Sequence, residues 1–321
     1  MRLTFRQIEY IREVARQGSI SSACKVLGIS ASSVLAAIKA AEEEVGTTIF
    51  VRRAAHGIDI TPAGQRFLVS ARRLLAAGLE FERATGKFSE QPAEVIRVGC
   101  FSPFGGMLVP PVLRRYLESN GDCEIVLLEG DQSQLRHWLS TGALDLVITY
   151  DIGEAFEAAI TPICKFPAHA IMRADDPLAG QEAVSMRELA GRPLILLDLP
   201  ETRTYLVTLF DFAAHRPKIG LHTRSYETVR VAVANGFGVS ILNMRPHEEA
   251  SPDSPVLRRL PISDPLRQPT LIVADPYGPQ KPGYVRAFID TLYQYVLDLT
   301  PEKLTVVKPE FAKDLLYPRP E

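Results

Sequence analysis

Hydroxyl and basic side chains recur through residues 1–61 at positions that suit contacts with phosphate groups. Hydroxyls and free backbone N–H groups at helix starts can donate to phosphate oxygens, and Arg and Lys side chains add positive charge. The candidates are Ser21, Ser22, Ser30, Ser32, Ser33, Lys39, Arg52, Arg53 and Thr61. The hydroxyls also suit helix capping, which one serine can combine with phosphate binding, and the arginine pair also suits a solvated surface. These residues predict contact with a nucleic-acid backbone.

A second group of polar and aromatic side chains follows hydrophobic runs that are typical of strands. Ligands in open α/β sheets bind at the carboxyl ends of strands, so we expect these side chains to face one cleft. The candidates are Ser102, Pro103, Phe104, Asp131, Gln132, Thr149, Tyr150, Pro200, Thr202, Arg203, Tyr205 and Tyr226. The Ser102 hydroxyl and the N–H groups of the loop at residues 99–106 suit a carboxylate, and the rings allow an aromatic acid. As alternatives, Asp131 suits a helix cap, Arg203 a surface ion pair and Tyr226 simple packing.

Three helices and a hairpin are needed to position the first group. Apolar residues at helical spacing are interrupted by glycines, which commonly end helices. The predicted elements are a helix from Phe5 to Gly18, a helix capped by Ser21 or Ser22 that ends at Gly28, a helix capped by Ser30 that ends at Gly46, strands at Thr47–Val51 and Ile58–Ile60 around a turn at His56 and Gly57, and a helix capped by Thr61 that runs from Pro62 to about Phe88. This order is typical of a winged helix-turn-helix, whose third helix enters the DNA major groove.

The third predicted helix carries few groups that can read bases. Its apolar face consists of Val34, Ile38, Ala41 and Val45. The outward positions are then Ser32, Leu35, Ala36, Lys39 and Glu43. None is an Arg, Asn or Gln that could bond one base through two hydrogen bonds. We therefore expect weak direct readout or a changed operator, with loss of DNA binding as the alternative.

From Val95 onward, strands alternate with helices, which is typical of an α/β domain with a mostly parallel sheet. The predicted strands are Val95–Gly99, Cys123–Leu128, Leu144–Thr149, Ala168–Met172, Leu194–Leu197, Ile219–Thr223, Val239–Leu242 and Thr270–Ala274, and the predicted helices are Gly105–Leu117, Gln132–Thr141, Met186–Ala190, Thr202–His215, Tyr226–Asn235 and Tyr284–Leu299. So long a stretch predicts two lobes. The expected division is a winged helix-turn-helix domain at 1–61, a linker and dimerisation helix at 62–91, a two-lobed domain at 92–300 (first lobe about 92–165 and 270–300, second lobe about 166–269) and a tail at 301–321.

The composition is typical of a soluble globular protein with uneven charge along the chain. Hydrophobic residues make up 46% and charged residues 23% of the 321, and the formal net charge is -2. Residues 1–90 carry 13 Lys and Arg against 9 Asp and Glu, which favours nucleic-acid contact at this end. No run is apolar enough for a membrane span or a secretion signal, so we expect a cytoplasmic protein.

The cysteines predict no metal or redox chemistry. Cys24, Cys100, Cys123 and Cys164 form no CxxC pair and accompany no histidine cluster. We therefore expect no metal, no cofactor and no disulfide framework, and interpret all four as idle thiols. A redox sensor would need a reactive thiol with a resolving partner, which the spacing does not reveal.

Short motifs along the chain resemble the LysR-type transcriptional regulators. They are Phe5–Ile11, Gly18–Ala23, Leu27–Ser30, Glu42–Gly46, Ile49–Arg53 and Thr61–Gly64, with weaker similarity through Gly99, Ser102–Pro103, Gly142–Leu146 and Ala234–Val239. The resemblance implies a two-lobed sensor domain like a periplasmic binding protein, a dimer through the helix after Thr61, and often a tetramer. It also implies promoter DNA and a small organic acid as partners, with RNA polymerase as a further one. Such proteins usually place Gln and a Ser-Arg pair where this chain has Ala31 and Leu35–Ala36.

The sequence also bears on two alternatives to a regulator that binds DNA. An enzyme is not expected, because the chain has no Gly-x-Ser-x-Gly turn, no His-Glu-x-x-His motif and no phosphate-binding loop. A dimer that acts by protein contact without binding DNA stays open. The sequence favours a regulator whose sensor domain binds a small organic acid, which can be aromatic. Binding of the acid is expected to change promoter binding or activation.

Overall fold

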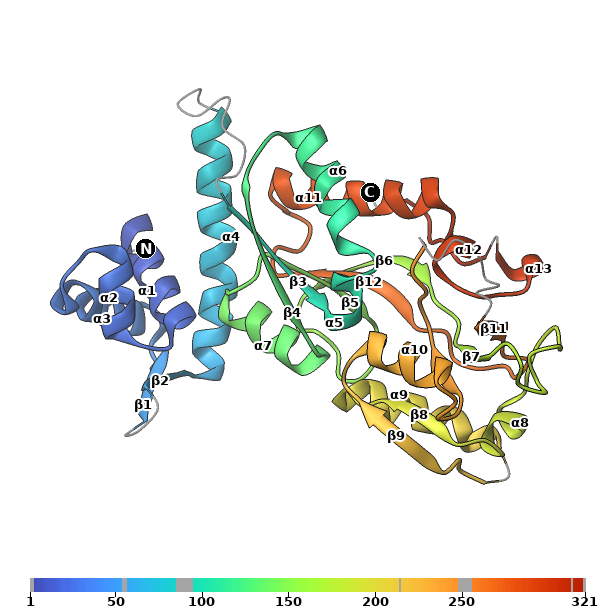
Figure 1. The fold of residues 1–321 in the computed structure, drawn as a ribbon. Helices are drawn as coiled ribbons and strands as arrows, with labels where there is room; N and C mark the ends of the chain where they lie inside the picture. Colours follow the sequence, from blue (N-terminus) through green and yellow to red (C-terminus); the bar gives the residue numbers. More distant parts are fainter. Residues whose placement is uncertain are drawn as a thin grey trace.

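The computed structural model describes residues 3–53, 57–84, 95–213, 215–247, 256–312 and 314–319. Figure 1 shows a small helical domain at one end, the long helix α4 (Pro62–Ala84) beside it, and a larger two-lobed domain beyond α4. Within the described residues, no single helix has the length and apolar character needed to cross a bilayer. The pair α2 (Ile20–Leu27) and α3 (Ala31–Val45) reaches that threshold only jointly, across a bend of 114°.

The three N-terminal helices end at the predicted glycines. Helices α1 (Phe5–Gln17), α2 and α3 are each followed by a glycine in the left-handed region, with φ of 61°, 65° and 75°. The Ser30 hydroxyl accepts a hydrogen bond from the Ser33 N–H at 3.3 Å and caps α3, as predicted. The expected cap of α2 is wrong: Ser21 and Ser22 lie inside the helix, and the Ser19 hydroxyl accepts from the Ser22 N–H at 3.4 Å.

One hydrophobic core holds these helices against the start of α4. Its fully or nearly fully buried members include Ile8, Ile11, Val14, Ala23, Val34, Ala37, Ile38, Ala41, Ile49 and Leu68. Val45, which we expected on the buried face of α3, is instead 40% exposed. No residue of α3 after Ala41 is buried, so the last turn of the helix extends past the core.

The hairpin is shorter than predicted at its first strand. β1 (Phe50–Arg53) pairs antiparallel with β2 (Gly57–Ile60), and His56 lies outside the described residues. The Ile49 and Phe50 N–H groups both donate to one Glu42 carboxylate oxygen, at 2.8 and 3.4 Å, and Phe50 is the first residue that pairs with β2.

Helix α4 begins at the predicted cap. The Thr61 hydroxyl accepts from the Gly64 N–H at 2.9 Å and donates to the Thr48 carbonyl oxygen at 2.7 Å. This joins the helix to the segment before β1. The predicted extension of the helix to Phe88 lies outside the described residues.

The first lobe contains a five-stranded sheet in the order β4-β3-β5-β12-β6. Strands β3 (Val95–Phe101), β4 (Glu124–Gly130) and β5 (Leu146–Tyr150) are parallel, so their carboxyl ends lie at one edge. Strand β12 (Thr270–Asp275) runs antiparallel to β5 and to β6 (Ala159–Lys165). The helices of this lobe are α5 (Ser102–Gly105), α6 (Val109–Asn120), α7 (Gln132–Thr141) and α11 (Gly283–Leu299).

The second lobe lies between β6 and β12 in the sequence. Strands β7 (His169–Arg173), β10 (Ser240–Leu242) and β11 (Leu257–Pro261) form an antiparallel sheet, and β8 (Leu194–Leu197) pairs parallel with β9 (Ile219–Thr223). Its helices are α8 (Met186–Ala190), α9 (Pro200–Thr208), the 3₁₀ turn η1 (Leu209–Phe212) and α10 (Tyr226–Ala234). The chain passes between the lobes twice, after β6 and after β11 (Figure 1).

Several predicted elements need correction. Strands β6 and β11 were not predicted, because Pro162 interrupts the first and two arginines the second; with them the sheets are mixed rather than mostly parallel. The expected helix Gly105–Leu117 divides, since α5 ends at Gly105 and α6 begins at Val109. The expected helix from Thr202 begins at Pro200 and gives way to η1 after Thr208.

The C-terminal segment, with α12 (Pro301–Leu304) and α13 (Pro309–Ala312), bonds to both lobes. The Thr305 hydroxyl donates to the Asn243 carbonyl oxygen at 3.1 Å, directly after β10. Farther on, the Tyr317 N–H donates to the carbonyl oxygen of Ile163 in β6 at 2.9 Å. The segment therefore fastens the second lobe to the edge of the first.

Gly64, in the first turn of α4, lies against Ile49 and against Ile60 of the hairpin. A Cβ there would be 2.3 Å from the Ile49 carbonyl oxygen and 2.9 Å from Ile60 Cγ2. We predict that Gly64→Ala lowers the free energy of unfolding by about 1–3 kcal/mol, because backbone must move, as measured by urea titration with circular dichroism. Gly180→Ala is the control, since nothing lies within 4 Å of that position. Equal stability of the two variants would contradict this account of α4.

Candidate functional site

Helices α2 and α3 have the geometry of a DNA-binding helix-turn-helix. Their directions differ by 114° across the break, within the range typical of this motif. The connection consists of Gly28, Ile29 and the cap Ser30. The hairpin of β1 and β2 follows, as in a winged domain.

The outward face of α3 is the one predicted. Its residues Ser32, Ser33, Leu35, Ala36, Lys39 and Glu43 are all exposed. The Lys39 ammonium lies 3.8 Å from the Glu43 carboxylate, and both side chains are well exposed, so this pair is weak. The face offers hydroxyls, apolar contacts suited to thymine methyl groups and one ammonium group.

The predicted phosphate ligands differ in exposure and in the hydrogen bonds that they already make. The Ser30 Oγ lies 2.8 Å from Ser32 Oγ and 2.9 Å from Ser33 Oγ, so three hydroxyls meet at the start of α3. Ser21 is exposed in the first turn of α2 and Ser22 half-buried. The Thr61 hydroxyl is already engaged in capping α4. Arg52 and Arg53 are placed in β1, and their side chains lie outside what the structure describes.

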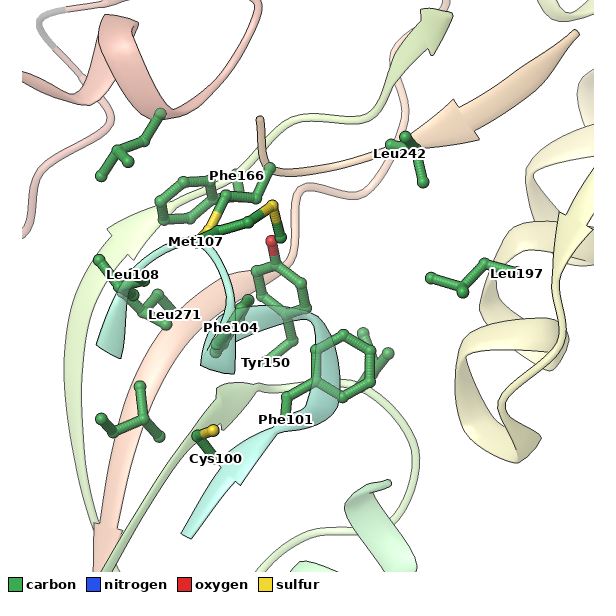
Figure 2. Packing of buried hydrophobic residues seen from close by; sticks show 14 of the residues in the cluster. Cys100, Phe101, Phe104, Met107, Leu108, Tyr150, Phe166, Leu197, Leu242 and Leu271 are labelled. Carbon is green, nitrogen blue, oxygen red and sulfur yellow. The ribbon is translucent and has the colours of Figure 1, made fainter. Parts of the chain in front are cut away.

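Six of the twelve candidates in the second group gather where the lobes meet. Pro103, Phe104, Tyr150, Thr202, Tyr205 and Tyr226 all line one cavity of about 20 Å³. Phe101, Phe104 and Tyr150 form its aromatic wall, with ring centroids 4.9–5.9 Å apart. Figure 2 shows the Tyr150 hydroxyl pointing away from the sheet toward Met107, with Leu197 and Leu242 of the second lobe across from the rings. Burial raises the pKa of Tyr150 well above its ordinary value, so this hydroxyl stays protonated.

Two larger chambers adjoin the cavity. One, of about 450 Å³, is lined by Ser102, Arg224 and Arg230 and shares Pro103 and Tyr226 with the cavity. The other, of about 790 Å³, is lined by residues that include Arg136, Glu201, Thr204 and Phe212, and by Pro200. Charged side chains therefore line the two chambers, whereas the cavity between them is lined mainly by apolar and aromatic side chains.

Four buried polar side chains have atoms without a hydrogen-bond partner within the described part of the chain, and two of them, Tyr150 and Thr202, line the cavity. The four are the Gln132 amide at the start of α7, the Thr149 and Tyr150 hydroxyls at the end of β5, and the Thr202 hydroxyl in the first turn of α9. Each unsatisfied buried group costs about 1–3 kcal/mol, and native proteins keep few of them. The two unpartnered hydroxyls of Tyr150 and Thr202 in the lining of one cavity indicate a binding site.

Two candidates have other partners. Arg203 is 55% exposed and pairs with Asp198 at 3.4 Å, which matches the surface-pair alternative. Asp131 caps α7 and also pairs with Arg224 of the second lobe at 3.1 Å. Neither lines the cavity.

The sequence reasoning missed several residues at the cleft. Asn243 and Met107 line the cavity, and Asn243 directly follows the buried strand β10, which was a usable signal. Arg136 and Glu201 bond each other across the lobes, with Arg136 Nη1 donating to Glu201 Oε2 at 3.1 Å. Their separation of 65 residues gave no signal.

Residues 5–65 match the family described as "Bacterial regulatory helix-turn-helix protein, lysR family", and residues 89–296 match "LysR substrate binding domain". The regulator CysB of Haemophilus influenzae is 24% identical over 78% of this chain and 79% of its own. Among solved structures, HinK of Pseudomonas aeruginosa, described as a LysR family regulator, is 30% identical, with a TM-score of 0.57 over 91% of this chain and 98% of that one. Full-length OxyR of the same organism has a TM-score of 0.73 at 22% identity, over 96% of this chain and all of that one.

Fold, site and similarity define a DNA-binding transcription regulator with an effector-binding domain. The chain belongs to the LysR family. Members of this family bind promoter DNA and small-molecule effectors and act as oligomers; they are regulators, not enzymes. The predicted family, fold class and regulatory function are thereby confirmed.

The buried cysteines give a prediction about thiol reactivity. Burial raises the pKa of both Cys100 and Cys164 to about 12, so little thiolate forms at neutral pH. We predict that two of the four thiols react slowly with Ellman's reagent at pH 8 in the folded protein. All four should react at once in guanidinium chloride, which is the control. Rapid reaction of Cys100 and Cys164 in the folded protein would contradict their burial and reopen a redox role.

Proposed function

We propose that this regulator binds double-stranded promoter DNA through α3 and the hairpin, and a small organic acid between its lobes, and that the acid changes promoter binding or activation. The observation that carries the sensing role is the pair of unpartnered buried hydroxyls, on Tyr150 and Thr202, in the lining of the cavity between the lobes. Buried polar groups in native proteins normally bond to protein atoms or to water. A bound ligand would supply the missing partners here.

The cleft suits an acid with an apolar or aromatic body, provided that the lobes move to admit it. A cavity of about 20 Å³ has room for little more than one water molecule. Within the described residues its lining contains no Lys or Arg, which favours an apolar or aromatic body there. The adjoining chamber offers the Ser102 hydroxyl and two arginines to the carboxylate end, which would compete with Asp131 for Arg224 and with Glu227 for Arg230. Ligand entry therefore requires the lobes to part and to close again.

We further propose that the protein works in the cytosol as a dimer or tetramer and contacts RNA polymerase. Leu68 and Leu75 of α4 are buried in the N-terminal core, so they are not available for a partner. Phe81, by contrast, is 69% exposed on the same helix. Its ring supports pairing of α4 with a second copy, because burial would remove that apolar surface from water.

The weak base-reading face of α3 leads to a prediction about salt dependence. If affinity rests on phosphate or minor-groove contacts by Arg52 and Arg53, replacing both by alanine should reduce the slope of log affinity against log salt by about one to two. Operator and scrambled duplexes should weaken alike, as measured by fluorescence anisotropy at several salt concentrations. Ser33→Ala and, unless it binds phosphate, Lys39→Ala should instead change the ranking of operators.

The control for charge loss is the pair Arg114→Ala and Arg115→Ala on α6, in the first lobe. This variant should keep the wild-type slope. If the wing variant keeps its slope while Ser33→Ala abolishes binding, direct readout dominates and this account of α3 is wrong.

A second prediction concerns the ligand. A small carboxylate that binds only the folded protein should raise its stability by about 3 kcal/mol at 100 times Kd, seen as a higher melting temperature in a screen of organic acids. Ser102→Ala should weaken this response, because the hydroxyl lines the chamber with the two arginines. Ser70→Ala, an exposed change on α4, should leave it intact. If no acid raises the melting temperature, the proposed class of ligand is wrong.

A further inference from the structure

Helix α7 reaches from the cleft to the linker helix. At its start, the cap Asp131 pairs with Arg224 of the second lobe at 3.1 Å. One turn on, Arg136 bonds Glu201 of α9, and both side chains are only 17% exposed. Its ten residues span about 15 Å. The first half of α7 therefore contacts the second lobe, while its end lies away from the cleft.

The other end of α7 is held by Arg72 of α4. Arg72 Nη1 donates to the Leu139 carbonyl oxygen and Nη2 to the Ser140 carbonyl oxygen, each at 2.5 Å. Both carbonyls belong to the last turn of α7, where an α-helix has few internal donors and where the helix dipole favours a positive charge. The Leu139 oxygen also accepts from the Gly142 N–H at 3.3 Å. The residue is 5% exposed, and burial lowers its pKa to about 10, so it remains charged at neutral pH.

Packing alone does not explain an arginine at position 72. A buried guanidinium is costly to desolvate, and an apolar side chain would fill the same space at lower cost. Its planar fork bonds two carbonyls at once, which sets the direction of α7 relative to α4 as well as their distance. A lysine keeps the charge but not this fork.

We propose that Arg72 couples the effector cleft to DNA binding, by holding α7 so that closure of the second lobe onto Arg136 and Asp131 reorients α4. This inference rests on the proposed function. Helix α1 of the DNA-binding domain packs on α4, so a change in α4 reaches α3 through one continuous core. Coupling then requires only that α7 move as a rigid body.

A double-mutant cycle tests the coupling without any effector. Glu201→Gln weakens the bond between the lobes, and Arg72→Lys removes the fork. The affinity of the full-length protein for a fluorescent duplex from the intergenic region upstream of its own gene is measured for wild type, both single variants and the double variant. We expect Glu201→Gln to change the Kd by about threefold or more in the wild-type background and to have no effect beyond error beside Arg72→Lys.

The control is Glu118→Gln, which breaks an exposed pair with Arg114 on α6 and should change the Kd in neither background. Equal factors for Glu201→Gln in both backgrounds, or no effect in either, would overturn the coupling alone. Failure of the wild type to bind the duplex would overturn the proposed function and the coupling with it.

Trp138 gives a second measurement that needs no variant. It is the only tryptophan, and it lies on α7 next to Leu139. Its ring packs against Gly130 at the end of β4. Saturating duplex should change its emission, excited at 295 nm, if DNA binding moves α7. Unchanged emission at saturation would overturn the coupling even if Arg72→Lys fails to fold.

Discussion

A buried guanidinium joins the two halves of this molecule. Arg72 belongs to the linker helix, yet its hydrogen bonds go to carbonyl groups 67 and 68 residues later in the chain. Its neighbour Arg73 adds a bond to the Pro276 carbonyl oxygen at 3.1 Å, after β12. Helix α4 packs on α1 of the DNA-binding domain and on α7 of the first lobe, so these contacts lie on a direct connection between the two.

The local signals in the sequence predicted most of the elements. Helix α7, strand β8 and strand β9 have the predicted bounds, because turn residues and caps surround short apolar runs. The errors have physical causes that local patterns do not contain. Strand β11 is held by pairing with β7 although it carries two arginines, and tertiary pairing overrode its weak propensity.

The candidate site could be predicted only in part. Strand ends and helix starts pointed to Tyr150, Thr202 and Tyr226, since topology brings such positions together. Arg203 is on the same helix as Thr202 but turns outward to Asp198. The pair Arg136 and Glu201 depends on how two lobes meet, and nothing in the order of residues specifies that. The role of Arg72 could not be predicted either, because it depends on how α4 packs against α7.

The proposed DNA-binding and effector-binding surfaces lie on different domains, and we propose that they communicate through α4 and α7. By thermodynamic reciprocity, whatever the cleft does to DNA affinity, DNA must do to the cleft. Hydrogen exchange of the intact protein, with and without saturating duplex, tests this directly. The account predicts changed exchange at residues 139–143 and at 223–225, as well as in α3. Changes confined to residues 5–61 would contradict it.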